Sequence, residues 1–153
     1  MRLTVIAVGR VRQGPVQALW QEYADRSVWP LSLVEVEAKA GGLAGARLKA
    51  AEADLLGAKI PEGARLVALD ERGDAPTSTA FADLLGGWRD EGVREVAFLI
   101  GGAEGLARPL VDRADRRLAF GPMTWPHQLV RVMLAEQLYR AQTILAGHPY
   151  HRA

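Results

Sequence analysis

The chain has 153 residues, no cysteine and a formal net charge of +1, and 49% of its residues are hydrophobic. This length suits one ordinary domain with a substantial core, and the missing cysteines exclude a disulfide framework and thiolate catalysis. No apolar run reaches membrane-spanning length, so we expect a cytoplasmic protein without a membrane partner.

Strands and helices alternate through the first half of the chain. Apolar and β-branched runs predict strands over residues 2–8 and 31–38. Pro15 suits the first turn of a helix between these strands, where the missing N–H costs nothing. A second helix is predicted over residues 43–56.

The second half continues the alternation. Strands are predicted over residues 65–70, 95–100 and 117–120, and a loop over residues 71–76. Helices are predicted after a cap at Thr77 or Ser78, over residues 109–115 and over residues 128–146. This order predicts one α/β domain over residues 1–153, built on a mainly parallel sheet with helices on both faces.

The last predicted helix is apolar around most of its circumference, whereas a surface helix of a small domain shows one apolar stripe. Such a helix needs cover on two sides. The sheet supplies one cover, and either a second subunit or burial within the protomer supplies the other. We expect the last helix to be outermost, which favours a homodimer.

Charge is unevenly distributed along the sequence. Residues 107–153 hold seven arginines against three acidic residues, a net charge of +4, so residues 1–106 carry −3. A basic C-terminal third suits an anionic partner such as RNA. A solvated surface that is rich in arginine is the alternative interpretation.

A glycine-rich segment, residues 101–105, follows a strongly apolar predicted strand. Glycines at the carboxyl end of a parallel strand allow the backbone to approach a ligand. Their spacing matches neither the dinucleotide pattern G-x-G-x-x-G nor a phosphate-binding P-loop. A ligand-binding turn and a tight turn without a ligand both remain open.

All three histidines, His127, His148 and His151, lie in the last 27 residues, beside Tyr150 and Arg152. Their spacing, with no cysteine, does not suit zinc, and we expect no metal site. Glu136 and Arg140 are spaced to brace the last helix as an i,i+4 pair. A terminus with this much chemistry is expected to be ordered by a partner subunit or a substrate.

Several segments together resemble the RlmH family of SPOUT methyltransferases, which methylate bacterial 23S rRNA. The likeness covers essentially the whole chain and is most specific from residue 121 onward. The matching segments are residues 67–70, 99–105, 123–131, 136–141 and 148–152. The resemblance implies a C-terminal trefoil knot, a homodimer, and methyl transfer from S-adenosyl-L-methionine (SAM) to N3 of a pseudouridine in the assembled ribosome.

The resemblance also implies the residues of the cofactor pocket. These are Leu69, Gly101, Gly121, Pro122, Met123, Thr124, Trp125 and Pro126. This chain departs from the usual family pattern at two places. At residues 121–122 relatives more often have a pair that contains serine, and at Trp125 they more often have leucine. Pro122 has no N–H, so any contact there must use its carbonyl or packing.

Removal of the proton from the acceptor N3–H requires a base or a cationic environment. Tyr150, His151 and Arg152 are the candidate catalytic residues, with His127 behind them. In a dimer, this tail is expected to serve the pocket of the neighbouring subunit. The alternatives are a non-catalytic ribosome-binding or assembly factor with the same fold, and a flavodoxin-like nucleotide enzyme.

Overall fold

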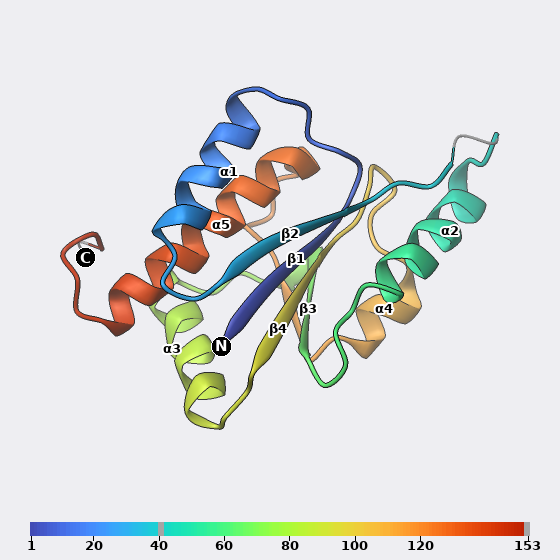
Figure 1. Ribbon diagram of the computed structural model, residues 1–153. Helices are drawn as coiled ribbons and strands as arrows, with labels where there is room; N and C mark the ends of the chain where they lie inside the picture. The colour runs from blue at the N-terminus through green and yellow to red at the C-terminus, as the bar shows by residue number, and fades with distance from the viewer. Residues whose placement is uncertain (40–41, 152–153) are drawn as a thin grey trace.

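The computed structural model describes residues 1–39 and 42–151, and a five-stranded sheet forms its centre. The strands are β1 (Arg2–Val8), β2 (Leu31–Val36), β3 (Arg65–Asp74), β4 (Glu95–Ile100) and β5 (Arg116–Leu118). They lie in the order β2-β1-β4-β3-β5, and every neighbouring pair is parallel (Figure 1). The predicted parallel sheet is therefore confirmed.

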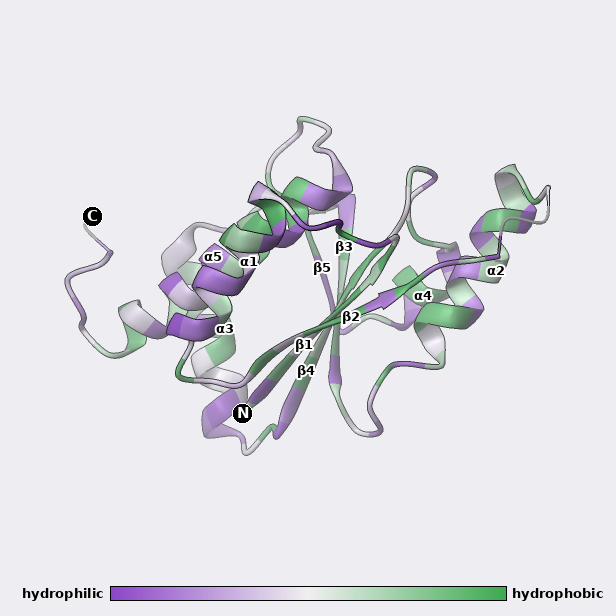
Figure 2. Ribbon diagram, turned by 45° about the horizontal axis from the view of Figure 1, so that its top comes forward, coloured by the Kyte–Doolittle hydropathy of each residue, from purple (hydrophilic) through white to green (hydrophobic). Residues whose placement is uncertain are grey.

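Helices cover both faces of the sheet, as predicted. They are α1 (Pro15–Arg26), α2 (Gly45–Gly57), α3 (Ser78–Asp90), α4 (Arg108–Arg113) and α5 (His127–Leu145). Helices α1, α3 and α5 lie on one face, and α2 and α4 lie on the other (Figures 1 and 2). Among the described residues, no helix is long and apolar enough to cross a membrane.

The central strands are apolar because both of their faces are buried. In β1, Leu3 and Val5 join the apolar cluster beneath α1, α3 and α5, whereas Ile6 and Val8 join the cluster beneath α2 and α4. Figure 2 shows the same continuous hydrophobic character along the centre of the sheet. The sheet is thus the common wall of two cores.

The position of α5 corrects one expectation. This helix is not outermost, because it lies between α1 and α3 and packs against both (Figure 1). Leu134, Ala135 and Leu138 are fully buried in this layer. Burial within one protomer therefore accounts for much of the apolar surface of α5, and that surface no longer argues for a dimer by itself.

The end of β3 also differs from the prediction. Residues 71–74 were expected in a loop, yet β3 continues to Asp74, with a register shift against β5 between Leu69 and Asp74. Gly73 permits this path, because a Cβ there would lie only 2.7 Å from the carbonyl carbon of Arg117. The other boundaries lie within about two residues of those predicted.

Candidate functional site

The main cleft lies at the carboxyl edge of the sheet, beyond the ends of β3, β4 and β5. Its volume is about 800 Å³, within the range of small-molecule sites. Ligands of open parallel sheets bind at this edge. The cleft is lined chiefly by residues 69–72, residues 100–106, residues 117–121 and residues 123–127. The glycine-rich segment, for which the sequence left a ligand-binding turn and a tight turn both open, is part of this lining.

The turn that follows β4 is the floor of this cleft, and its shape requires glycine. A Cβ on Gly101 would lie 2.5 Å from the carbonyl carbon of Gly105, so no side chain fits there. Gly105 has φ of +72° and donates its N–H to the carbonyl of Gly102 at 3.0 Å. The turn is therefore a tight backbone structure that also lines the cleft.

Beside this turn lies a carboxylate that was not predicted from the sequence. Glu52 of α2 is buried, and both of its oxygens lie 3.2 Å from where a Cβ on Gly102 would stand. Burial, and then the neighbouring Glu104, raise the pKa of Glu52. The available signal was a charged residue four positions from both Leu48 and Leu56 on the inner face of a helix.

The loop over residues 121–126 lines another part of the cleft. Met123 and Trp125 of this loop are 69% and 40% exposed. The indole N–H of Trp125 donates to the carbonyl of Phe120 at 3.2 Å, which orients the ring at the cleft. Every residue that the family resemblance implies for cofactor binding lines the cleft except Pro122, which lies outside its lining.

His127 begins α5 and also lines the cleft. Burial, and then the positive charge of Arg131, lower the pKa of His127. The imidazole is therefore neutral at neutral pH, and one ring nitrogen can accept a hydrogen bond. Its Nε2 lies 3.6 Å from where a Cβ on Gly9 would stand, close to the end of β1.

The described part of the C-terminal tail folds back on the middle of α5. The phenol of Tyr150 donates to Oε1 of Glu136 at 3.1 Å, and the Arg140 guanidinium lies 4.9 Å from the centre of the Tyr150 ring. Nδ1 of His151 lies 3.4 Å from Nη1 of Arg140. Arg152, the fourth predicted catalytic residue, lies outside the described residues.

Glu136 is the centre of this tail cluster. It accepts hydrogen bonds from Arg140, as the predicted brace requires, and from Gln137 and Tyr150 as well. Burial first, then hydrogen bonding with Tyr23 and Glu136, raises the pKa of Tyr150 beyond the usual range. Tyr150 is therefore a protonated donor here, not a base. From the sequence, Glu136 was expected only to brace α5 through Arg140.

Among the described residues, a single protomer does not bring His127 together with Tyr150 and His151. Glu136, which anchors Tyr150, lies nine residues after His127 on the same helix. At 1.5 Å per residue this is about 14 Å along the helix axis. His127 therefore borders the cleft, while Tyr150 and His151 lie on the flank of α5.

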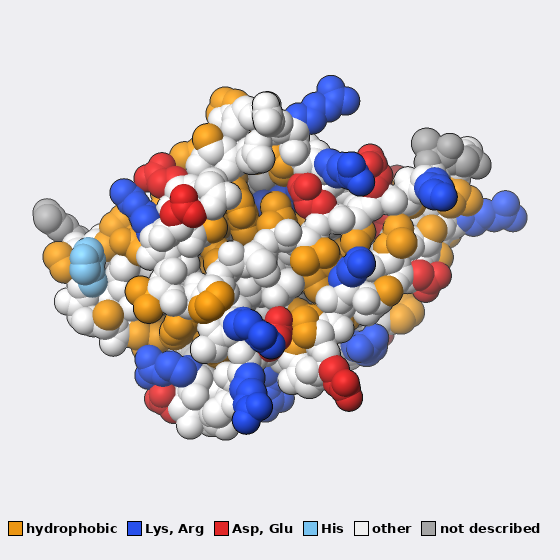
Figure 3. Space-filling view, in the orientation of Figure 1, with side chains coloured by type: hydrophobic (Ala, Val, Ile, Leu, Met, Phe, Trp, Pro, Cys, Tyr) orange, Lys and Arg blue, Asp and Glu red, His pale blue; other side chains and the backbone are white. Residues whose placement is uncertain are grey.

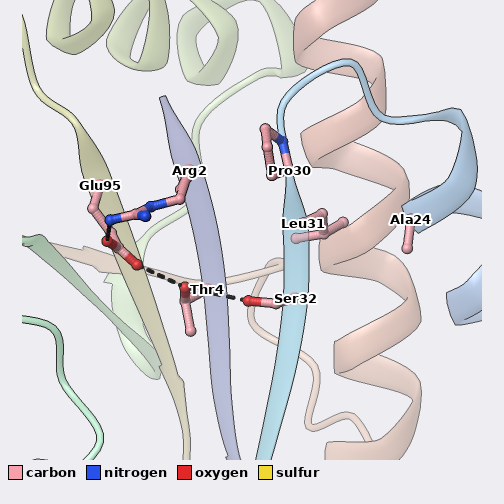
Figure 4. Close-up of a pocket in the computed structure, with 7 residues that line it drawn as sticks. All are labelled: Arg2, Thr4, Ala24, Pro30, Leu31, Ser32 and Glu95. Atoms are coloured by element: carbon pink, nitrogen blue, oxygen red, sulfur yellow. Dashed lines mark hydrogen bonds and ion pairs between the residues drawn. The ribbon is translucent and has the colours of Figure 1, made fainter.

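A second hollow lies at the amino edge of the sheet, with a volume of about 600 Å³ (Figure 4). Arg2 donates to Glu95 at 2.8 Å, Thr4 donates to Glu95 at 3.0 Å, and Ser32 donates to Thr4 at 3.3 Å. These polar groups satisfy one another. Within residues 1–39 and 42–151, no cluster of three metal-ligating side chains is present.

The amino-acid sequence of this chain is similar to those of known proteins. A family model described as "Predicted SPOUT methyltransferase" matches residues 1–151. The chain is 63% identical over 153 residues to the ribosomal RNA large subunit methyltransferase H of Rhodospirillum centenum, with 100% of each chain covered. It is 56% identical over 152 residues to the protein of the same name in Paramagnetospirillum magneticum, with 99% of each covered.

Two solved structures share the fold at low sequence identity. A probable methylase family protein from Haemophilus influenzae superposes with a TM-score of 0.56 at 10% identity, over 99% of this chain and 70% of that one. TrmJ from Z. mobilis superposes with a TM-score of 0.55 at 18% identity, over 94% of this chain and 71% of that one. These likenesses concern the fold alone.

Proposed function

This chain belongs to the RlmH family of SPOUT methyltransferases, and on that premise we propose that it methylates N3 of a pseudouridine in 23S rRNA of the assembled ribosome, with SAM as donor. Its relatives are named as methyltransferases of large-subunit ribosomal RNA. The observation that carries the proposal is the cleft at the carboxyl edge of the sheet. Every residue that the resemblance implies for SAM binding lines this cleft, except Pro122.

The chemistry of the cleft suits such a donor. Leu69, Met123 and Trp125 offer apolar surface, and the turn after β4 has glycine at positions 101, 102 and 105, where the backbone carries no side chain. When bound, SAM supplies an electrophilic methyl group on a sulfonium, which is transferred without a metal. The protein's task is then to position the acceptor and to help remove its proton.

The tail residues supply the groups for the acceptor nucleotide. Tyr150 stays protonated and acts as a hydrogen-bond donor, so proton removal at N3 falls to His151 or to another base. Arg152 is proposed to stabilise the imide anion by a charge-assisted hydrogen bond. His127, held neutral at the cleft, completes the proposed catalytic set.

The proposed enzyme is a homodimer in which the tail of one protomer completes the cleft of the other. The placement of Tyr150 about 14 Å along α5 from His127 supports this arrangement, since one protomer alone leaves the two groups apart. The proposal includes the C-terminal trefoil knot that the resemblance implies. A cytoplasmic location follows from a ribosomal substrate.

The second candidate is a non-catalytic ribosome-binding or assembly factor with the same fold. The intact glycine turn and the tail motif at residues 148–151 favour the enzyme, because a factor without activity has no need of either. A flavodoxin-like nucleotide enzyme is excluded by membership of the methyltransferase family.

The test is incubation of the protein with labelled SAM and ribosomes from a strain that lacks its own enzyme, followed by mapping of the modified nucleotide. We expect one methylated pseudouridine in 23S rRNA, methylated at N3. A variant truncated after Gly147 should bind ribosomes and transfer no methyl group. Ribosome binding without methyl transfer by the full chain would favour the assembly factor.

A further inference from the structure

Arg131 is the largest of the fully buried side chains described, with 1% of its surface exposed. It stands on α5 four residues after His127, so the two side chains share one face of the helix. A buried guanidinium is costly unless it is paired and hydrogen-bonded. Its presence therefore calls for a specific set of partners.

Those partners are the carboxyl ends of two strands. Arg131 Nη2 donates to the carbonyls of Val8 and Gly9, the latter at 2.9 Å, and Nη1 donates to Oε1 of Glu35 at 2.8 Å. Glu35 also accepts the backbone N–H of Val11 at 2.7 Å. One side chain thus joins the start of α5 to β1, to β2 and to the segment that follows β1.

The groove beside this pair gives no further reason for the charge of Arg131. Arg131 and Glu35 line this groove, which lies between α1 and β2 with a volume of about 280 Å³, and most of its other lining residues are hydrophobic (Figure 3). The side chain of Glu35 is 26% exposed, whereas that of Arg131 is 1% exposed. Replacing a whole buried ion pair by apolar side chains of similar size is often neutral or stabilising, so a gain in stability does not by itself account for this pair.

What the pairing does fix is the register of α5 against the sheet. The turn of α5 that carries Arg131 also carries His127 and Val130, and both of these line the main cleft. The preceding loop, residues 121–126, enters α5 directly and lines the same cleft. A shift of this turn would move the wall of the cleft.

We propose that Arg131 is a positioning residue for methyl transfer: by holding the first turns of α5 on the ends of β1 and β2, it sets the wall formed by His127, Val130 and the loop before them. This inference rests on the proposed function, because it assumes that the cleft binds the donor. Glu35 is the second member of the device, since it neutralises the guanidinium and fixes its plane.

The test compares Arg131→Met and Arg131→Lys with a matched core variant, Leu85→Ala. Leu85 is fully buried on α3 and is not among the residues that line the main cleft, so Leu85→Ala reports loss of packing alone. For each variant we would measure Tm, the Kd for SAM by calorimetry, and kcat and KM with ribosomes. Arg131→Met removes the hydrogen bonds and keeps the apolar volume.

We expect both Arg131 variants to lose on the order of 100-fold in kcat/KM, while their Tm falls no further than that of Leu85→Ala. The loss should appear in the Kd and KM for SAM as well as in kcat. Wild-type SAM affinity and turnover in Arg131→Met would overturn the inference. Losses of kcat/KM and SAM affinity that are no larger than those of Leu85→Ala at the same fall in Tm would overturn it equally.

Two further measurements separate this inference from the proposed function. If the wild-type protein transfers no methyl group, the NMR signal of the His127 imidazole still reports the position of the turn. That signal should shift in Arg131→Met and stay unchanged in Leu85→Ala. If the Arg131 variants do not fold, Glu35→Gln, which keeps an acceptor oxygen, should show a smaller loss of SAM affinity and of kcat/KM. Unchanged SAM affinity and kcat/KM in Glu35→Gln would contradict the proposal.

Discussion

Gly101→Ala tests the glycine turn at the floor of the cleft. The new methyl carbon would stand 2.5 Å from the carbonyl carbon of Gly105 and 2.7 Å from the nitrogen of Leu106. Non-bonded carbon atoms prefer separations of about 3.5–4.0 Å, so backbone must move by about 1 Å. Overpacking of this kind costs about 1–3 kcal/mol of the free energy of unfolding.

The same movement opens the turn that lines the cleft, so we expect Gly101→Ala to lose SAM binding by calorimetry and to unfold at lower urea concentration. The matched control is Gly87→Ala, on an open side of α3 where a Cβ would meet nothing within 4 Å. That change should raise stability by about 0.5–1 kcal/mol. Wild-type SAM affinity and an unchanged urea midpoint in Gly101→Ala would refute the reasoning.

Three smaller predictions follow from other contacts. Tyr150→Phe removes the hydrogen bond to Glu136, a contact with a charged group worth about 1.5–3 kcal/mol, so amide exchange in the tail should accelerate while α5 stays protected; unchanged exchange would contradict this. The pKa of His127 is lowered in the folded state, so folding favours the neutral imidazole. The full contribution to stability is therefore present above the unfolded pKa and is lost as the pH falls through the folded pKa. His127→Gln should flatten this part of the urea-unfolding profile between pH 7.5 and 5, and a profile identical to that of the wild type would exclude His127 as its cause. Thr77→Ala removes the cap whose side chain accepts the Ala80 N–H at 3.2 Å, and urea unfolding should show a loss of about 1 kcal/mol; a loss confined to a few tenths would mean that the cap contributes little.

Sequence periodicity was sufficient for the sheet and its covering helices, because the alternation of strands and helices permits few arrangements. It was insufficient for the place of α5. The order of helices around a sheet depends on the order of strands, and strand order was not readable from residues 128–146 alone. The expectation that the last helix is outermost failed for that reason.

The cleft was predictable in outline because its walls are the glycine-rich turn and the proline-bounded loop, both of which follow strands. Glu52 and the anchoring role of Glu136 were not identified. Each is a charged residue whose partners come from a distant segment: Glu52 lies against Gly102, and Glu136 binds Tyr150 fourteen residues later. Spacing within one helix carries no information on such contacts.

The composite site is tested most directly by complementation between two inactive variants. One variant, Gly101→Ala, has a damaged cleft and an intact tail; the other, truncated after Gly147, has an intact cleft and no tail. Co-expression of the two, followed by the ribosome methylation assay, should restore about a quarter of wild-type sites, since half of randomly paired dimers hold one complete site. Methyl transfer that stays at the level of the separate variants would contradict the account.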